Sequence, residues 1–126
     1  MIYLASPYTH NDPKVEEARY QFACLATGRL IKEGQHVYSP IAHSRAIAQQ
    51  TDLPTDFGFW AAYDTDMISK CDEVVVLTLN GWKESKGVQA EINIARALNK
   101  PIRYQNYCDS KEPVTKETVV AMDAGL

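Results

Sequence analysis

The chain has 126 residues, 45% of them hydrophobic and 23% charged, which is an ordinary composition for one globular domain and leaves no room for a second. A formal net charge of −3 argues against a surface built for a polyanion, so we expect no polymeric nucleic acid as a partner, although a single nucleotide is compatible. No apolar run is long enough to span a bilayer and the three cysteines lack a disulfide-framework spacing, so we expect no membrane partner and a cytoplasmic location.

Apolar patterning and turn residues predict strands and helices in alternation, starting with a strand. The predicted strands are Ile2–Ala5, His36–Ile41, Glu73–Leu79 and Ile102–Gln105. The predicted helices are Pro13–Gly34, Ala42–Gln50, Asp56–Lys70, Val88–Leu98 and Val114–Ala124. Between the third strand and the next helix, Ser85, Lys86 and Gly87 predict a small, flexible connection.

This alternation is typical of the α/β class. We predict one domain over residues 1–126, built as a three-layer, doubly wound parallel sheet of four or five strands of the flavodoxin-like or Rossmann-like type. The crevice of such a sheet lies at the carboxyl ends of its strands, where the strand order reverses. That rule would gather Ala5–Tyr8, Ser39–Ser44 and Asn80–Gly87 around one pocket.

Two carboxylic acids interrupt the apolar stripes of two predicted helices. Glu91 lies three residues after Val88 and four before Ala95, and Asp64 occupies the step between Ala61 and Ile68. An ionised carboxylate that faces a sheet must be paired, neutral or held for use. For Glu91 alone, a first-turn position favoured by the helix dipole is an equally good interpretation. Asp64 lies in the helix before the third predicted strand and Glu91 in the helix after it, and the presence of two such acids favours a functional pair.

Polar residues also crowd the predicted crevice, although each one alone is compatible with a solvated loop. They include Ser6 after the first strand, His43 after the second and Ser85 after the third. His43 has no neighbouring Cys or His at ligand spacing, so we predict no metal site. The chain has no G-x-G-x-x-G after its first strand and no Walker loop, and we expect no cofactor.

Four short motifs together carry a family resemblance. They are IYLASP at the N-terminus, SPIAHS after the second strand, an acid eight residues before the Asp of CDEVVVL, and S-x-G-x-x-x-E-x-x-x-A. In their order and spacing the chain resembles the nucleoside 2-deoxyribosyltransferase-like superfamily over roughly residues 1 to 105. It is similar to the deoxynucleoside 5'-monophosphate N-glycosidases in that superfamily, and more closely to a small bacterial and phage branch.

The resemblance implies roles for three residues. Glu91 matches the nucleophile that attacks the anomeric carbon of the sugar, Asp64 matches the acid before the strand, and Tyr3 matches the tyrosine of the first strand. Ser85 stands where the transferases have an Asp and the nucleotide hydrolases a Ser, which favours a phosphate ligand. The glycine-rich, arginine-bearing loop of the hydrolases is replaced here by residues 6–10.

The leading hypothesis is therefore cleavage or transfer of an N-glycosidic bond in a nucleoside or nucleoside 5'-monophosphate. Glu91 would be the nucleophile, Asp64 the general acid and Tyr3 the residue that orients Glu91. The predicted substrate-binding residues are Ser6, His43, Trp60, Asp66, Ser85 and Gly87. Two alternatives stay open, a nucleotide-binding or sensing module without turnover and an interaction protein with a vestigial crevice.

We also expect a homo-oligomer, at least a dimer. A sheet in so short a chain leaves a shallow crevice, whereas a small ligand is normally buried over most of its surface. The superfamily that the chain resembles completes its sites with residues of a neighbouring subunit. Aromatic residues in the segment from Trp60 to Tyr63 would suit a symmetric contact at the crevice edge, although they could instead belong to the core.

Overall fold

Four parallel strands form one sheet in the order β2-β1-β3-β4 in the computed structural model, which describes residues 1–107. The strands are β1 Ile2–Ala5, β2 Val37–Tyr38, β3 Glu73–Leu77 and β4 Ile102–Gln105. The helices are α1 Pro13–Lys32, α2 Pro40–Thr51, α3 Phe57–Lys70 and α4 Lys86–Ala97. The predicted α/β class and parallel sheet are confirmed, whereas the helix predicted over Val114–Ala124 lies outside the described residues.

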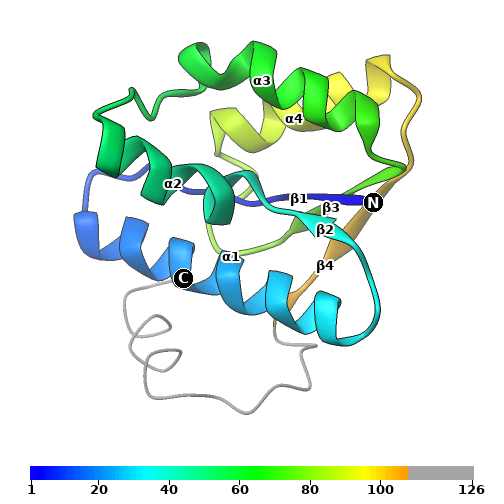
Figure 1. Cartoon of the computed structure of the whole chain (residues 1–126), viewed down its shortest axis with the longest axis horizontal. Helices are drawn as coiled ribbons and strands as arrows, with labels where there is room; N and C mark the ends of the chain where they lie inside the picture. Colours follow the sequence, from blue (N-terminus) through cyan, green and yellow to red (C-terminus); the bar gives the residue numbers. More distant parts are fainter. Residues whose placement is uncertain (108–126) are drawn as a thin grey trace.

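The sheet is covered on both faces, which makes three layers of the flavodoxin-like or Rossmann-like kind (Figure 1). Side chains of β1 alternate between the two faces, as the pleat of a strand requires. Leu4 packs with Phe22 of α1 in one cluster, and Tyr3 packs with Ile68 of α3 and Ile92 of α4 in the other. Helix α1 therefore covers one face, and α3 and α4 cover the other.

The second strand is shorter than predicted because a helix begins where the strand was expected to continue. Ser39 is the N-cap of α2 and its hydroxyl accepts a hydrogen bond from the Ala42 amide at 3.1 Å. Pro40 follows as the first helical residue, a position where its missing N–H is not needed. The prediction that Pro40 closes a strand was wrong, since a capping serine and a proline together start a helix.

The predicted flexible connection before α4 was also wrong. Ser85 is the N-cap of α4, and its hydroxyl accepts a hydrogen bond from the Val88 amide at 3.2 Å. Lys86 and Gly87 are the first two residues of the helix. The first turn of α4 is thus fixed by a cap, and its unpaired amides face the carboxyl end of the sheet.

The strand order reverses between β1 and β3, the two central strands, which pair from Ile2 with Glu73 to Ala5 with Val76. The chain leaves β1 for α1 on one face and leaves β3 for α4 on the other. Past the last paired residues the two connections diverge, which opens a crevice at this point. Within residues 1–107, no helix is both long and apolar enough to cross a membrane.

Candidate active site

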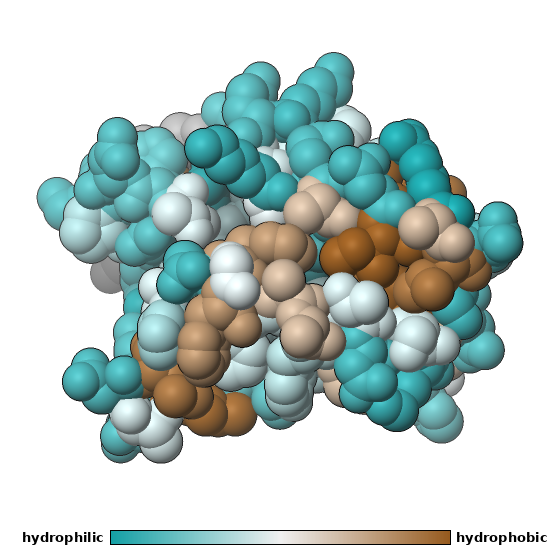
Figure 2. All heavy atoms as spheres, turned by 90° about the horizontal axis from the view of Figure 1, so that it is seen from above, coloured by the Kyte–Doolittle hydropathy of each residue, from teal (hydrophilic) through white to brown (hydrophobic). Residues whose placement is uncertain are grey.

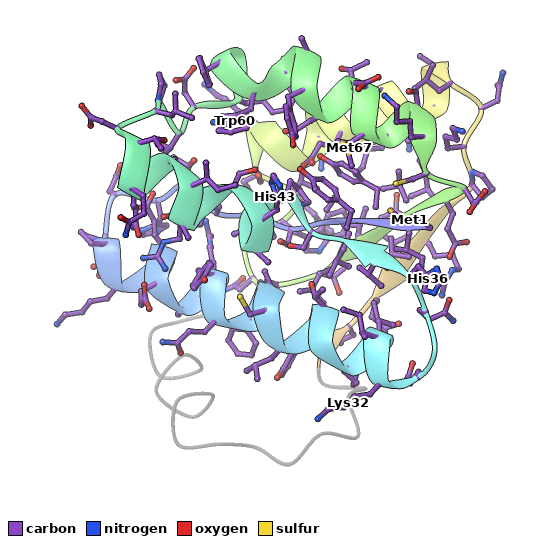
Figure 3. The ribbon with its side chains drawn as sticks, in the orientation of Figure 1. Met1, Lys32, His36, His43, Trp60 and Met67 are labelled. Carbon is purple, nitrogen blue, oxygen red and sulfur yellow. The ribbon has the colours of Figure 1, made fainter. Side chains whose placement is uncertain are left out.

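A pocket of about 660 Å³ opens at the carboxyl ends of β1 and β3, which is within the usual size range of small-molecule sites. Ser6 and Tyr8 line it from the loop after β1, and Glu84 lines it from the loop after β3. Figure 3 shows Trp60, which also lines the pocket, in the upper part of the molecule to the left of centre, with Met1 and His36 toward the right. The pocket therefore lies where the reversal of strand order predicts a site.

Three helices supply the remaining walls, each through residues at helical spacing. Helix α2 presents Ile41, Ser44, Arg45 and Ala48; α3 presents Phe57, Trp60 and Asp64; α4 presents Lys86, Gly87 and Glu91. Asp64 and Glu91 are the deepest acidic members, with only 6% and 5% of their surfaces exposed. Two helices on one face of the sheet thus bring both predicted acids to one cavity.

Glu91 is held from behind by the sheet. The Tyr3 phenol, fully buried on β1, donates a short hydrogen bond to Glu91 Oε2. The pKa of Tyr3 is raised, first by burial and then by the charge of Glu91, so the phenol keeps its proton and remains the donor. Tyr3 therefore fixes one oxygen of Glu91.

Asp64 has no such support. Its Oδ1 atom is buried and has no hydrogen-bond partner among the described residues, and the same is true of Ser6 Oγ on the pocket wall. Buried polar atoms are normally paired, so two unpaired ones in one pocket indicate places for ligand or water atoms. Both residues can exchange hydrogen bonds with a bound molecule without giving up an existing partner.

The two carboxyl groups have raised pKa values. Burial raises the pKa of Asp64 to about 6. Burial also raises the pKa of Glu91 to about 8, while the hydrogen bond from Tyr3 lowers it and the charge of Asp64 raises it. Because the charge of Asp64 raises the pKa of Glu91, the pair favours a state that holds one proton between its two carboxyls.

Charges of both signs surround this pair. Arg45 and Lys86 are the basic residues that line the pocket, and Asp56 and Glu84 are further acidic ones. Arg45 makes an ion pair with Glu17 and stacks over the Tyr20 ring at 4.3 Å from its centroid. Lys86 lies in the first turn of α4, where the helix dipole adds positive potential.

Most of the predicted binding residues lie at the pocket, but two do not. Ser6, Trp60, Ser85 and Gly87 line it together with Asp64 and Glu91. His43 is exposed on α2, where its ring stacks on Tyr63 of α3 with centroids 6.0 Å apart, and Asp66 faces solvent in an ion pair with Lys70. His43 and Asp66 are therefore not among the residues that line this pocket.

Sequence reasoning missed two arginines. Arg45 lines the pocket from a helix with a weak apolar pattern, and no sequence signal distinguished its pocket-facing side. Arg19 is buried on α1, and it did carry a signal, because it lies four residues after Val15 and three before Phe22 on the inward stripe. The argument that found the two acids, a charged residue on an apolar stripe, would have found Arg19 as well.

Among residues 1–107, no three His, Cys, Asp or Glu side chains gather closely enough to hold a metal ion. A family model described as "Domain of unknown function (DUF1937)" matches residues 1–106. A search of curated proteins found no match. The family description assigns no activity, so the chemistry must be argued from the pocket.

Proposed function

We propose that this chain, which belongs to the DUF1937 family, cleaves or transfers the N-glycosidic bond of a nucleoside or nucleoside 5'-monophosphate. One observation carries the proposal: two buried carboxyls interact in one pocket, and only Glu91 is held by a buried phenol. A fixed carboxylate suits nucleophilic attack, and an unpaired acid suits proton donation.

The reaction requires one proton on the carboxyl pair. In the reactive form Asp64 carries this proton, and the Tyr3 hydrogen bond stabilises the Glu91 carboxylate. Glu91 then attacks the anomeric carbon, the bond to the base breaks, and the base nitrogen takes the proton of Asp64. A glycosyl ester on Glu91 and a free base result.

The second step regenerates the pair. The Asp64 carboxylate accepts a proton from water, the water oxygen attacks the anomeric carbon, and the ester bond to Glu91 breaks. Addition of a second base in place of water gives transfer instead of hydrolysis. Either route returns Glu91 as a carboxylate and Asp64 as an acid, so the pair begins the next cycle with one proton.

The pocket also suits the rest of a nucleotide. Trp60 and Phe57 offer aromatic surface for a base, and Ser6 and Asp64 offer unpaired polar atoms for sugar hydroxyls. Ser85, Lys86 and Gly87 form the N-terminal turn of α4, a position that favours a phosphate. The resemblance seen in the sequence supports the same substrate class.

Two further expectations accompany this function. We propose a homo-oligomer, because Phe59 and Tyr63 leave 49% and 43% of their surfaces exposed beside the pocket-lining Trp60. Figure 2, which looks onto the side of α3, shows hydrophobic surface spread over this face. We also propose a cytoplasmic location, which suits the free thiols of Cys24 and Cys71.

The direct test is incubation with a panel of nucleosides and nucleoside 5'-monophosphates, with chromatography to detect free base. Glu91→Gln should abolish base release, and Asp64→Asn should slow it about 10²- to 10⁴-fold. Asp66→Asn is the matched control on the same helix and should be nearly silent because Asp66 faces solvent. Binding of these compounds without base release would reject the enzyme and leave a nucleotide-binding module.

A further inference from the structure

Arg19 joins the two loops that contribute residues to the walls of the pocket. From α1 its Nη1 atom donates to the carbonyl oxygens of Thr9 at 3.0 Å and Tyr8 at 3.4 Å, in the loop after β1. Its Nη2 atom donates to the carbonyl of Asn80 at 3.2 Å, in the loop after β3. One side chain therefore spans the divide at which the strand order reverses.

The loops need such a tie because the sheet cannot supply it. Backbone pairing between β1 and β3 ends with Ala5 and Val76, and beyond this point the chain turns to opposite faces. The guanidinium approaches from the α1 side, whereas the pocket opens on the side of α3 and α4, so it can support the loops without occupying the pocket.

The surroundings of Arg19 differ from those of an ordinary buried arginine. It is 7% exposed, and within residues 1–107 no carboxylate lies at ion-pair distance from it. Arg29, on the same helix and 9% exposed, pairs with Glu33 at 3.5 Å. A guanidinium is planar and presents donors in fixed directions, so Arg19 can hold carbonyls on two sides at once.

Gly81 shows how closely the loop after β3 follows this side chain. A Cβ atom at Gly81 would lie 2.5 Å from Arg19 Nη2, and the residue has φ +91°, a conformation that favours glycine. Any other residue at Gly81 would push against the guanidinium. The loop is therefore shaped to admit Arg19.

We propose that Arg19 is a positioning residue that sets the relative placement of the loops after β1 and β3, and with it the geometry of the pocket. Its effect on base release rests on the proposed function, but its effect on the loops does not. Loss of this clamp frees Tyr8 and Thr9 on one wall and Glu84 and Ser85 on the other.

The first measurement follows amide hydrogen exchange in the full chain. Reporter amides exist in both loops, because the His10 amide donates to Glu16 Oε2 at 3.0 Å and the Trp82 amide to the Leu79 carbonyl at 3.0 Å. In Arg19→Met both should exchange about 10- to 100-fold faster, since hydrogen bonds to a charged group are lost on both sides. Arg29→Met, the matched control, should leave both reporters unchanged.

Two further variants separate a clamp from simple filling of space. Arg19→Lys keeps the charge but reaches fewer carbonyls, so it should restore protection in at most one loop. Gly81→Ala displaces the guanidinium while keeping it in the protein, and should loosen the loop after β1 as well. Unchanged exchange in Arg19→Met, or equal loosening in Arg29→Met, would overturn the proposal.

Activity is measured separately on the same proteins. Arg19→Met should lower kcat about 10²-fold, which is the effect of a misplaced reacting group. The pH values at which the rate rises and falls should stay unchanged, because Arg19 does not act on the pKa of Glu91. If the natural protein releases no base from any nucleoside or nucleotide, the proposed function fails, and the exchange measurement still decides the role of Arg19. Faster loop exchange with unchanged kcat would overturn the link between the clamp and the pocket.

Discussion

The Tyr3 phenol donates its hydrogen bond to Glu91 across 88 residues of sequence, and so connects the first strand to α4 in the interior of the protein. Both groups are buried, so water cannot replace the bond if it is lost. Among the described interactions, this contact alone favours the ionised form of Glu91, because burial and the charge of Asp64 both raise its pKa. The first prediction tests this balance.

Tyr3→Phe should lower kcat about 10- to 100-fold, since a hydrogen bond to a charged group is worth about 1.5 to 3 kcal/mol. Without the phenol the pKa of Glu91 rises further, so the alkaline limb of the pH profile should move to higher pH. The measurement is kcat/KM for base release between pH 5 and about 10. An alkaline limb that stays in place would show that the phenol does not act on Glu91.

The wild-type rate should depend on pH as a bell. Below about pH 6 both carboxyls are protonated and no nucleophile is present, and above about pH 8 both are ionised and no acid is present. We therefore expect kcat/KM to be highest between these values. Asp64→Asn should lose the alkaline limb and keep the acidic limb, because Glu91 must still ionise, whereas a flat profile in the wild type would contradict the one-proton mechanism.

Stability should fall as pH rises through the same range. The folded pKa values of about 6 for Asp64 and about 8 for Glu91 lie above the ordinary values of 3.8 and 4.5, so the folded state binds more protons than the unfolded state between them. Stability from these groups is complete below about pH 4 and is lost as pH rises toward 8.

Glu91→Gln isolates the contribution of one carboxyl. The variant should become more stable than the wild type as pH rises, by about 2 to 4 kcal/mol between pH 5 and 8, because each tenfold change in proton binding is worth about 1.4 kcal/mol. Urea unfolding at several pH values measures the difference. If the difference in free energy of unfolding between the two proteins does not change with pH, the pKa of Glu91 is not raised in the folded state.

The phosphate preference can be tested at the start of α4. The wild type should bind a 5'-monophosphate more tightly than the matching nucleoside, as measured by isothermal titration. Ser85→Asp should reverse this order, because it places a negative charge beside the phosphate. Since Asp is also a good N-cap, the helix should keep its first turn, and the variant should fold normally. Equal affinities in the wild type would reject the phosphate site.

Light scattering should give a mass of at least two chains at micromolar concentration. Phe59→Asp should reduce it, because a charge on the exposed face of α3 opposes a symmetric apolar contact. Ile31→Asp is the matched control, since Ile31 is 54% exposed on α1, which covers the opposite face of the sheet. A single-chain mass in the wild type would contradict the oligomer, and equal effects of both variants would place the contact elsewhere.

Much of the fold could be predicted because local chemistry and packing agree. The run from Glu73 to Leu77 is apolar on both faces and forms a buried central strand, and Asp12 caps α1 as its sequence indicates. Agreement failed at Ser39, which was predicted within a strand, and at Ser85, which was predicted in a loop, because each is the N-cap of a helix. Ser39 and Pro40 carry the same cap signal as Asp12 and Pro13, but the apolar residues around Ser39 favoured a strand in the sequence.

The candidate site could be predicted only in part, and for a related reason. Asp64 and Glu91 could be recognised in the sequence because each is a charged residue that interrupts an apolar stripe. The topology of the sheet then places both in one pocket. The outward rotation of His43 and the inward rotation of Arg45, two residues apart on α2, depend on how that helix packs against its neighbours. No pattern within the helix itself contains that information.

The central position of β1 also has a consequence for synthesis on the ribosome. This strand is made before its main partner β3, so its pairing with β3 cannot form until Glu73 has been synthesised. Its other partner, β2, contributes only two residues. A nascent chain that ends before β3 therefore exposes a strand of Ile2, Tyr3 and Leu4 with little to pair with. Pauses in translation between β1 and β3 should leave this apolar segment open to chaperones, and folding should begin only when β3 has emerged.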